Sequence, residues 1–528
     1  MRITLICTDS DEWAFGVRMM SAVLKRAGHS PRLILLSTES AAYSEDVLEQ
    51  TAELAAGSGM VGLGCYSRCA SKAHQLAARL RRSGVPLLWG GLHATLNPDE
   101  CARAAGVVCR GEGEEAILEF VERLEEGRDW REVRNLAFER NGSVVLNPVR
   151  PPLPSLDDLP IMDFERADEW RLAGSELKQV SSDPKDSPAV RLQYIGSRGC
   201  AFRCTYCCNR AIKELYSNDP KYLRRMSPAV YVSQLATLCR DRFPKARDIF
   251  LMDEDFLMRG VPELREFCDL YSKQVGLPFD CMVSAPRITE EKLEVLFAAG
   301  LWRVSLGVES GSERTKKTVF DRPIPNRSLT RASQVLRRFP GIAGCYYFII
   351  GNPYEEQPDL LETLCLMTKL EPPFFISMYN LVFFPGSELY NRAVRDGIIT
   401  GVRDSGCELH FRGGLNYAGH AWKHKHVYLN GLLFLTEGKA TRRRLGLVPR
   451  AAIPFLTRPG VIEFMERHRW FCRAVIGTKV AQLRARSRAG AVLKRLVGNP
   501  ADAFNLPRLF KKVLLGRFAM AKAGSPVA

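Results

Sequence analysis

The residues of this chain best suited to chemistry are three cysteines on one short segment. In GSRGCAFRCTYCCNR, three residues separate Cys200 from Cys204, and two separate Cys204 from Cys207. Three thiolates on one loop can bind three irons of a cubane cluster, which leaves the fourth iron without a protein ligand. An open coordination position is what a catalytic metal centre needs. The spacing therefore predicts a [4Fe–4S] cluster with one iron free to bind a small molecule.

Two other interpretations of this loop stay open. The cysteines could pack in a buried loop, or they could bind a structural zinc ion with Cys208 as the fourth ligand. Adjacent side chains point apart, so we expect Cys208 to pack or to face a second domain. Cysteines elsewhere lie in apolar stretches and are expected to be small core residues, for example Cys7, Cys109, Cys281, Cys345 and Cys365.

The cysteine loop follows the first strand of an α/β repeat that we expect over residues 191–400. Helical patterns are expected at 228–242, 261–275, 289–299 and 328–339. The strand candidates between them are LQYIGS, DIFLMDE, FDCMVSA, RVSLGVES, CYYFIIG and FFISMYNLVFF. Six such units predict a partial (β/α)6 barrel with its chemistry at the carboxyl ends of the strands.

The cysteine loop, with Tyr206 before its last cysteine, resembles the radical S-adenosylmethionine (SAM) superfamily. This resemblance implies that SAM chelates the open iron through its amino and carboxylate groups. It also implies that the reduced cluster cleaves SAM to methionine and a 5′-deoxyadenosyl radical. Tyr206 would contact the adenine, and Glu309 in VSLGVESGSE would lie near the ribose hydroxyls. The segment FIIGNPYEE, around Gly351 and Pro353, resembles the strand end that follows.

The resemblance also suggests how the methionyl part of SAM is bound. Asp253 and Glu254, in FLMDEDF, occupy the place where the family has residues near the SAM amino group, although its Gly-Gly-Glu is absent. Ser284 and Arg287 would reach the methionyl carboxylate. A carboxylate at a strand end is also often only a helix N-cap, which is the structural alternative for Asp255 or Glu309.

Residues 1–148 alternate short apolar strands with helices, which predicts a parallel, Rossmann-like sheet covered on both faces. Ligands of such sheets bind beyond the carboxyl ends of the strands. The candidate binding residues at those ends are Thr8, Asp9, Cys65, Tyr66, Ser67, Gly90, Gly91, His93, Thr95, Gly111, Glu112 and Gly113.

The segment GGLHATLNPDE, followed by VVCRGEGEEA, resembles the cobalamin (B12)-binding domain that precedes many radical SAM domains. A flat corrin ring needs close approach of the backbone, which glycine permits. The Asp-x-His-x-x-Gly motif that ligates cobalt in many such domains is absent. The lower face of the cobalt would then be open, bound by water or near Cys65, Tyr66 or Ser67.

His93 is the tempting replacement for the missing cobalt ligand. A lone histidine near a turn more often hydrogen-bonds the surrounding loop, so we favour that role for His93 over cobalt ligation. The alternative for the whole domain is a degenerate fold that is kept for packing or for docking of a substrate.

The positive charge of the chain is confined to its C-terminal part. Residues 401–528 contain 24 Lys and Arg against 6 Asp and Glu, whereas the first 400 residues contain 51 against 53. We expect a surface linker at 149–190, which is rich in Pro, Asp and Ser, and a basic helical region at 401–528. That region is interpreted as a helical cap with a solvated face, or as a contact with anionic membrane lipid. Nucleic-acid binding is not expected, because no binding motif is found.

No apolar run approaches the roughly 20 residues that span a bilayer, and the N-terminus lacks the features of a signal peptide. We therefore expect a cytoplasmic α/β enzyme with peripheral membrane contact at most. The two resemblances imply a cobalamin-dependent radical SAM enzyme in which methylcobalamin gives its methyl group to an unactivated carbon of a small-molecule or lipid-like substrate. A second SAM would remethylate the cobalamin, and flavodoxin or ferredoxin would donate electrons.

Two alternatives to methylation remain at this stage. The same cofactors could support a rearrangement or cyclisation without methyl transfer. The chain could also be a non-catalytic cobalamin or iron–sulfur sensor that docks through its basic C-terminal region.

Overall fold

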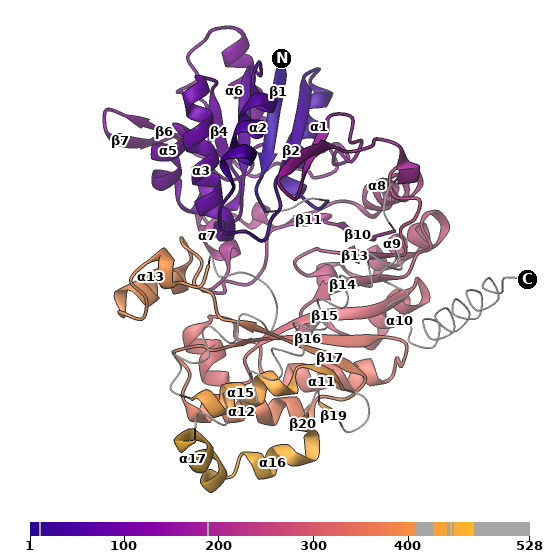
Figure 1. Cartoon of the computed structure of the whole chain (residues 1–528). Coiled ribbons are helices and arrows are strands. Elements are labelled where there is room, and N and C mark those ends of the chain that lie inside the picture. The colour runs from indigo at the N-terminus through magenta and orange to yellow at the C-terminus, as the bar shows by residue number, and fades with distance from the viewer. Residues whose placement is uncertain (10–11, 187–188, 408–425, 441–443, 446–447, 469–528) are drawn as a thin grey trace, which may run out of the picture.

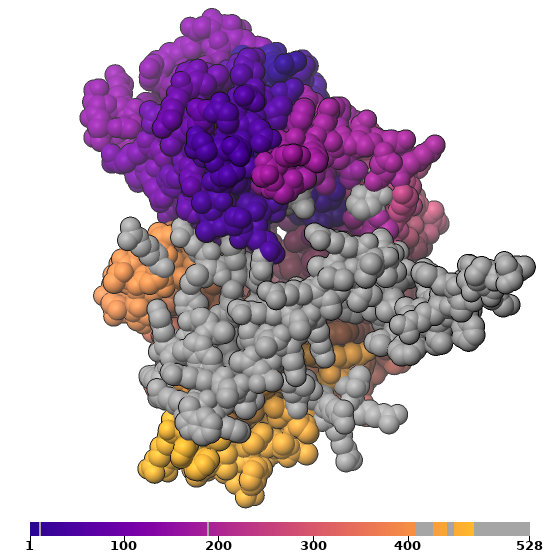
Figure 2. Space-filling model, viewed as in Figure 1, coloured from indigo at the N-terminus to yellow at the C-terminus, as the bar shows by residue number. Residues whose placement is uncertain are grey.

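The computed structural model describes the chain except for residues 10–11, 187–188, 408–425, 441–443, 446–447 and 469–528. Two α/β units lie one above the other in Figure 1, and a group of short helices follows at the opposite end from the N-terminal unit. The space-filling view of the same face also has the N-terminal unit at one end and the residues of these last helices at the other (Figure 2). This arrangement confirms the predicted fold class.

A nine-stranded sheet forms the N-terminal unit, in the order β7-β6-β5-β4-β3-β1-β2-β8-β9. The six strands from β5 to β8 in this order run parallel, and β6, β7 and β9 are antiparallel additions at the edges. The strands are β1 Arg2–Cys7, β2 Ser30–Leu35, β3 Met60–Gly64, β4 Leu87–Gly90, β5 Val107–Cys109, β6 Leu136–Arg140, β7 Ser143–Leu146, β8 Glu169–Ala173 and β9 Glu176–Gln179.

Helices cover both faces of this sheet, as its apolar strands require. One face packs against α1 and α6, and the other packs against α2, α3 and α5. The helices are α1 Phe15–Arg26, α2 Glu45–Ala55, α3 Ala70–Leu80, α4 Leu92–Leu96, α5 Pro98–Ala105 and α6 Glu114–Glu125. The carboxyl ends of β1, β3, β4 and β5 are therefore left free for a ligand.

The segment predicted as a surface linker, 149–190, differs from that expectation because it contributes β8 and β9 to the first sheet. A fully buried ion pair attaches β8 to α1: Arg18 Nη1 lies 2.8 Å from Glu169 Oε2, and both side chains are inaccessible to solvent. The Arg18 guanidinium also lies 4.5 Å from the centre of the Phe164 ring. The segment thus completes the N-terminal unit.

Replacement of Glu169 by alanine is expected to destabilise the protein by about 3–5 kcal/mol, because the fully buried charge of Arg18 would lose the carboxylate that lies 2.8 Å away. Urea denaturation followed by circular dichroism would measure the change. Glu176→Ala is the matched control, since its ion pair with Lys178 is exposed and should contribute at most about 1 kcal/mol. Equal stability of the two variants would contradict the role assigned to Glu169.

The second sheet has six parallel strands followed by one antiparallel strand, in the order β10-β13-β14-β15-β16-β17-β18. Within the described residues β10 and β17 do not pair with each other, so the barrel is open, and the predicted partial (β/α)6 barrel is confirmed. Its parallel strands are β10 Arg191–Tyr194, β13 Asp248–Leu251, β14 Phe279–Val283, β15 Leu301–Glu309, β16 Ala343–Ile350 and β17 Phe374–Asn380.

Helices on the outside of the barrel alternate with these strands. They are α7 Cys208–Leu215, α8 Pro228–Asp241, α9 Val261–Gln274, α10 Glu290–Ala298, α11 Asn326–Arg337, α12 Gln357–Lys369 and α13 Glu388–Arg395. A short antiparallel pair, β11 Ser197–Arg198 with β12 Arg224–Arg225, adjoins the cysteine loop. Of the cysteines predicted to be core residues, four are buried, namely Cys7, Cys109, Cys281 and Cys345. The prediction was wrong for Cys365, which is exposed on α12.

The chain after the barrel begins with an apolar helix, α15 Val427–Thr436, that packs against α12 and β16. The other elements are β18 Gly438–Ala440, β19 Arg444–Leu445, β20 Val448–Pro449, α16 Ile453–Leu456 and α17 Pro459–Arg467. Most of the region predicted to be basic and helical, 401–528, lies outside the described residues, including all of 469–528. In the part of the chain that the structure describes, every helix is too short or too polar to cross a bilayer.

Candidate active site

The cysteine loop leaves the carboxyl end of β10 and returns into α7. Two glycines allow this path. A Cβ atom on Gly196 would lie 2.5 Å from the Tyr231 ring, and one on Gly199 would lie 2.5 Å from the carbonyl oxygen of Tyr222. Gly199 also has a φ of +89°, a left-handed conformation that favours glycine. Backbone packing at these two positions fixes the loop so that its three thiols face one region.

The three thiols lie close enough to act on one another electrostatically. Burial, with smaller contributions from Glu254, Cys207 and Cys204, raises the pKa of Cys200 to about 12. Burial also raises the pKa of Cys204, and a hydrogen bond with Cys208 together with burial raises the pKa of Cys207. Thiols in such surroundings ionise when a bound cation compensates the charge. Three converging thiols with this chemistry fit the three protein-bound irons of a cubane cluster.

A half-buried arginine next to the cysteine loop, Arg322, is a site residue that the sequence interpretation missed. Arg322 Nη1 donates to Cys204 Sγ at 3.5 Å, and Arg322 Nη2 donates to the Gly307 carbonyl at 3.3 Å. The guanidinium lies 4.5 Å from the centre of the Phe202 ring. Cys204 and Arg322 are 118 residues apart in the sequence, so only the fold brings this charge to the thiols.

Replacement of Arg322 by glutamine is expected to make the cluster harder to reduce, because a positive charge and a hydrogen bond to Cys204 would be lost. The expected shift is on the order of −60 mV, which corresponds to about 1.4 kcal/mol for one electron. A redox titration monitored by electron paramagnetic resonance would measure it. Arg322→Lys, which keeps the charge, should restore most of the potential, and an unchanged potential in the glutamine variant would refute the assignment.

Glu309 and Tyr206, which the sequence predicts as SAM contacts, lie on the same side of the site as Arg322. Burial raises the pKa of Glu309, while Arg322 and a hydrogen bond from Tyr206 oppose this shift. Glu309 has a φ of +66° beside a bulge in β15, which is a strained conformation for a residue with a side chain. The Tyr206 ring packs edge-on against Phe320, with 4.9 Å between ring centres.

The two predicted SAM contacts in the acidic segment after β13, Asp253 and Glu254, point in different directions. Asp253 is fully buried and accepts a hydrogen bond from Tyr231 at 2.9 Å, with Arg259 3.8 Å away. Glu254 instead lines a cavity and hydrogen-bonds Asn209. Loss of hydration raises the pKa of Glu254, and this hydrogen bond opposes the shift. Only Glu254 of this pair is therefore in a position to contact a ligand.

Ser284 and Arg287, the predicted contacts of the methionyl carboxylate, are joined through Asp255. The Ser284 hydroxyl donates to Asp255 Oδ2 at 2.5 Å, and Arg287 Nε lies 3.1 Å from the same oxygen. Asp255 and Ser284 are buried, whereas the Arg287 side chain is 39% exposed. Asp255 thus holds both residues at the end of β14. A ligand carboxylate here would compete with Asp255 for Arg287.

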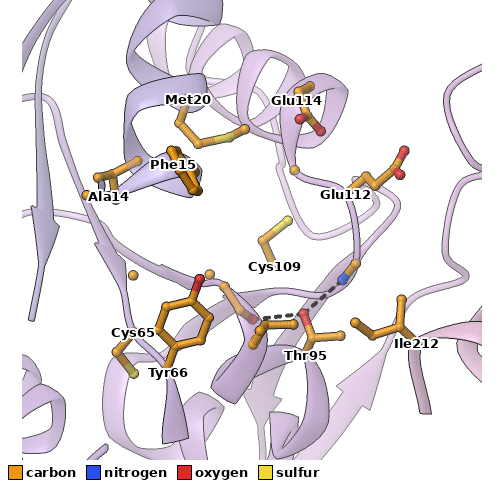
Figure 3. A pocket seen from close by; sticks show the side chains of 18 of the residues that line it. Ala14, Phe15, Met20, Cys65, Tyr66, Thr95, Cys109, Glu112, Glu114 and Ile212 are labelled. Atoms are coloured by element: carbon orange, nitrogen blue, oxygen red, sulfur yellow. Dashed lines mark hydrogen bonds between the residues drawn. The ribbon is translucent and has the colours of Figure 1, made fainter. Parts of the chain in front are cut away.

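A cavity of about 390 Å³ lies between the two α/β units, beyond the carboxyl ends of β1, β3, β4 and β5. Figure 3 shows Phe15 and Met20 of α1 on one side and Tyr66 and Thr95 on the other. The barrel contributes residues that follow β10 and β13, including Ser197, Asn209 and Glu254. The cysteine loop and the strand ends of the N-terminal unit therefore border one space.

Glycines shape the part of this cavity formed by the N-terminal unit. A Cβ atom on Gly90 would meet no atom within 4 Å, so any side chain there would project into open space. Gly91 and Gly111 have φ values of +89° and +74°. Thr95 Oγ1 donates to the Gly91 carbonyl at 2.9 Å and accepts from the Gly111 amide at 3.1 Å (Figure 3). This cradle of exposed backbone fits a large flat ligand such as a corrin.

Most of the sequence-predicted residues of the N-terminal unit line the cavity, namely Asp9, Cys65, Tyr66, Gly90, Gly91, Thr95, Gly111, Glu112 and Gly113. Thr8, Ser67 and His93 do not line it. Thr8 is fully buried, and its carbonyl accepts a hydrogen bond from Tyr43. The His93 ring is directed toward Ser67 and Glu100 instead, which agrees with a role in the loop rather than at cobalt. The sequence interpretation missed the lining residues Phe15, Met20, Cys109, Ile212 and Tyr216.

Asp9 and Glu112 each hold parts of the cavity wall together. Asp9 accepts hydrogen bonds from Cys7 Sγ at 3.1 Å and from the Tyr66 amide, and burial raises its pKa. Glu112 pairs across the two units with Arg224 and with Arg198, whose Nη1 lies 3.3 Å away. Burial opposes ionisation of Glu112, but these arginines outweigh it and lower its pKa. The charged contacts fix the width of the cavity.

Comparisons with known proteins match the two parts of the chain that border the cavity. A family model described as the radical SAM superfamily matches residues 194–366, and one described as a B12 binding domain matches residues 1–121. The chain thus joins a B12-binding domain to a radical SAM domain. Its cofactors are accordingly a [4Fe–4S] cluster, SAM and cobalamin; the cysteine loop would hold the cluster and the glycine cradle the corrin.

The chain is similar in sequence to two methyltransferases and in fold to a solved SAM radical enzyme. Uncharacterized methyltransferase PH0819 of Pyrococcus horikoshii is 25% identical over 351 residues, which cover 64% of this chain and 70% of that protein. Cytidylyl-2-hydroxyethylphosphonate methyltransferase of Streptomyces wedmorensis is 26% identical over 378 residues, with 65% and 68% covered. The structure of the cobalamin-dependent SAM radical enzyme OxsB, with aqua-cobalamin and SAM bound, matches with a TM-score of 0.60 and 16% identity, and covers 100% of this chain and 81% of OxsB.

Proposed function

We propose that this radical SAM enzyme methylates an unactivated carbon of a small-molecule or lipid-like substrate. The observation that carries the proposal is the single cavity that borders both the glycine cradle of the N-terminal unit and the residues beside the cysteine loop. When bound, the cluster with SAM supplies a 5′-deoxyadenosyl radical, and the corrinoid supplies a methyl group. A substrate carbon placed in this cavity would be within reach of both.

The residues of the barrel have separate roles in this proposal. Tyr206 and Glu309 orient the adenosyl part of SAM, and Arg322 holds Glu309 and Cys204 by its charge. When SAM binds, Arg287 would leave Asp255 and pair with the methionyl carboxylate of SAM. Glu254, at the cavity and close to the cluster cysteines, accepts hydrogen bonds from the SAM amino group. Of these side chains, Glu254 is the one that lines the cavity.

The walls of the cavity suit radical chemistry because they are mainly apolar. Trp13, Phe15 and Met20 cover one side, and Ile195 and Ile212 lie nearer the barrel. Apolar walls offer a carbon radical few groups with which to react. The ion pairs of Glu112 with Arg198 and Arg224 hold the corrin-binding and SAM-binding surfaces at a fixed separation. A flavodoxin or ferredoxin is proposed as the electron donor.

The decisive experiment uses protein reconstituted anaerobically with iron, sulfide and hydroxocobalamin, then reduced and given SAM with a deuterated methyl group. We expect 5′-deoxyadenosine and S-adenosylhomocysteine together, and the label on the protein-bound corrinoid. Mass spectrometry of the products and of the extracted corrinoid would detect both.

The other outcomes of this experiment separate the alternatives. Formation of 5′-deoxyadenosine without S-adenosylhomocysteine would indicate that the enzyme catalyses a rearrangement or cyclisation and not a methylation. Absence of both products, with the cluster and corrinoid still bound, would indicate a non-catalytic sensor. Hydrolysis of SAM by a contaminant is excluded by a parallel sample without reductant, in which neither product should form.

Contact with anionic membranes is the proposed role of the basic C-terminal region. Within its described part, Phe455 of α16 and Phe464 of α17 are 55% and 59% exposed, with Arg458 and Arg467 beside them. Removal of residues 469–528 is expected to weaken binding to phosphatidylserine vesicles at least about tenfold, since several cations that attract the surface would be lost. Vesicle cosedimentation would measure it. The truncation keeps α15–α17, so SAM cleavage should stay unchanged, and unaltered vesicle binding would contradict the membrane role.

A further inference from the structure

Three side chains that could bind a metal meet on the N-terminal unit, away from the cavity lining. His74 lies on α3, His93 on α4 and Glu100 on α5. One ligand atom from each residue can be chosen so that all lie within 4.8 Å of one another. His74 Nε2 is 2.6 Å from Glu100 Oε1, and His93 Nε2 is 3.9 Å from the same oxygen. Three helices therefore direct two imidazoles and one carboxylate to one point.

The His93 ring shows that this cluster is more than a chance surface contact. Its side chain is 1% exposed, yet Nε2 has no hydrogen-bond partner among the described residues. A buried polar atom without a partner is unfavourable and needs an explanation. Glu100 is too far away, at 3.9 Å, to accept a hydrogen bond from it. The nitrogen is thus directed at the cluster with its bonding capacity unused.

The other ring nitrogen of His93 is held in the way that is typical of a metal ligand. His93 Nδ1 lies 3.1 Å from Ser67 Oγ, which can accept its proton. The Asn97 amide is also near Nδ1, but its two protons can go to the carbonyl oxygens of His93 and Pro385. With the proton on Nδ1, Nε2 presents a lone pair. Burial lowers the pKa of His93 to about 4, so the ring is neutral at ordinary pH.

We propose that His74, His93 and Glu100 bind a zinc ion. Two imidazoles and a carboxylate are a common ligand set for zinc. At zinc–ligand distances of about 2.0–2.2 Å, tetrahedral ligand atoms lie roughly 3.4 Å apart. The ion therefore requires Glu100 to move slightly away from His74 and toward His93. The Glu100 side chain is 46% exposed and free to make that movement, and water completes the coordination.

The position of this site in the fold indicates what the zinc does. His93 belongs to α4, which directly follows Gly90 and Gly91 and also carries Thr95, a residue of the cavity wall. A zinc ion would link α4 to α3 and α5 through side chains that do not line the cavity. It would therefore stabilise the glycine cradle without touching the corrin or SAM. This role is independent of the reaction proposed above.

The test uses anaerobically reconstituted holoenzyme that has been dialysed against a chelator and then titrated with Zn²⁺ in a calorimeter. We expect one zinc per chain in addition to the cluster iron. His74→Gln and Glu100→Gln should each weaken zinc affinity at least about tenfold. Both side chains are partly exposed, so these variants should fold. His29→Gln, on the same unit, is the matched control and should bind zinc like the unaltered protein.

Iron and sulfide analysis of each sample, expected at about four per chain, shows that zinc has not replaced the cluster. X-ray absorption at the zinc edge should then report two imidazole ligands. Failure of the holoenzyme to bind zinc would overturn the proposal. So would binding that is unchanged in both His74→Gln and Glu100→Gln, or a zinc spectrum dominated by sulfur ligands.

Discussion

Replacement of Cys207 by alanine is expected to abolish reductive cleavage of SAM. The cluster would lose one of its three thiolate ligands, so iron content should fall well below the roughly four atoms per chain of the intact protein. Cys200→Ala and Cys204→Ala should have the same effect. The measurements are iron and sulfide analysis, electron paramagnetic resonance of the reduced protein and release of 5′-deoxyadenosine.

Cys208→Ala is a demanding control for this prediction, because it removes the neighbouring thiol from the same loop. Cys208 begins α7, directly after the last of the three predicted ligands. Its replacement should leave the iron content and SAM cleavage near those of the unaltered protein. If Cys208→Ala lost the cluster while Cys207→Ala kept it, the ligand assignment would be wrong.

Replacement of Gly90 by phenylalanine should remove corrinoid binding while leaving the cluster intact. No atom lies within 4 Å of a Cβ at Gly90, and its backbone is not left-handed, so the new side chain can occupy the cavity without straining the chain. A phenyl ring there would exclude the corrin. We expect corrinoid affinity to fall at least about tenfold, equivalent to about 1.4 kcal/mol.

The readouts for this variant separate the two cofactor sites. Corrinoid content is measured by absorption after extraction, and S-adenosylhomocysteine formation should disappear with it. Reductive SAM cleavage to 5′-deoxyadenosine should continue. Gly460→Phe is the control, since a side chain at Gly460 would also enter open space, but Gly460 lies on α17 and is not part of the cavity lining. Normal corrinoid content in Gly90→Phe would mean that the cradle binds something else.

The regular elements of both units were predictable because the buried apolar residues recur in the sequence with the period of a helix or a strand. The helix expected at 261–275 is α9 Val261–Gln274, and the six barrel strands occur where short apolar runs were found. The hairpin of β6 and β7 was not predicted, although Asn141-Gly142 at its turn is a well-known hairpin signal. Both turn residues have positive φ values, 51° and 79°.

The candidate site was predictable only where its residues are close together in the sequence. The cysteine loop and the glycines at the strand ends carry local patterns that reveal their roles. Arg322 carries no such pattern, because its importance comes from contact with Cys204 across the fold. The same holds for Asp253, whose side chain is directed to Tyr231, and for His93, whose ring points away from the cavity. Side-chain direction at a strand end depends on neighbours that only the fold supplies.

The return of β8 to the edge of the first sheet has a consequence for biosynthesis. Arg18 is among the earliest residues to leave the ribosome, but its partner Glu169 follows about 150 positions later. Until then Arg18 lacks its nearest carboxylate and β8 is missing from the sheet, so the N-terminal unit cannot complete its native packing during early translation. Stable folding should begin only after β9 has emerged, when the first barrel strand is already close behind. The two units are therefore expected to complete their folding nearly together, so both walls of the cavity between them form at about the same time.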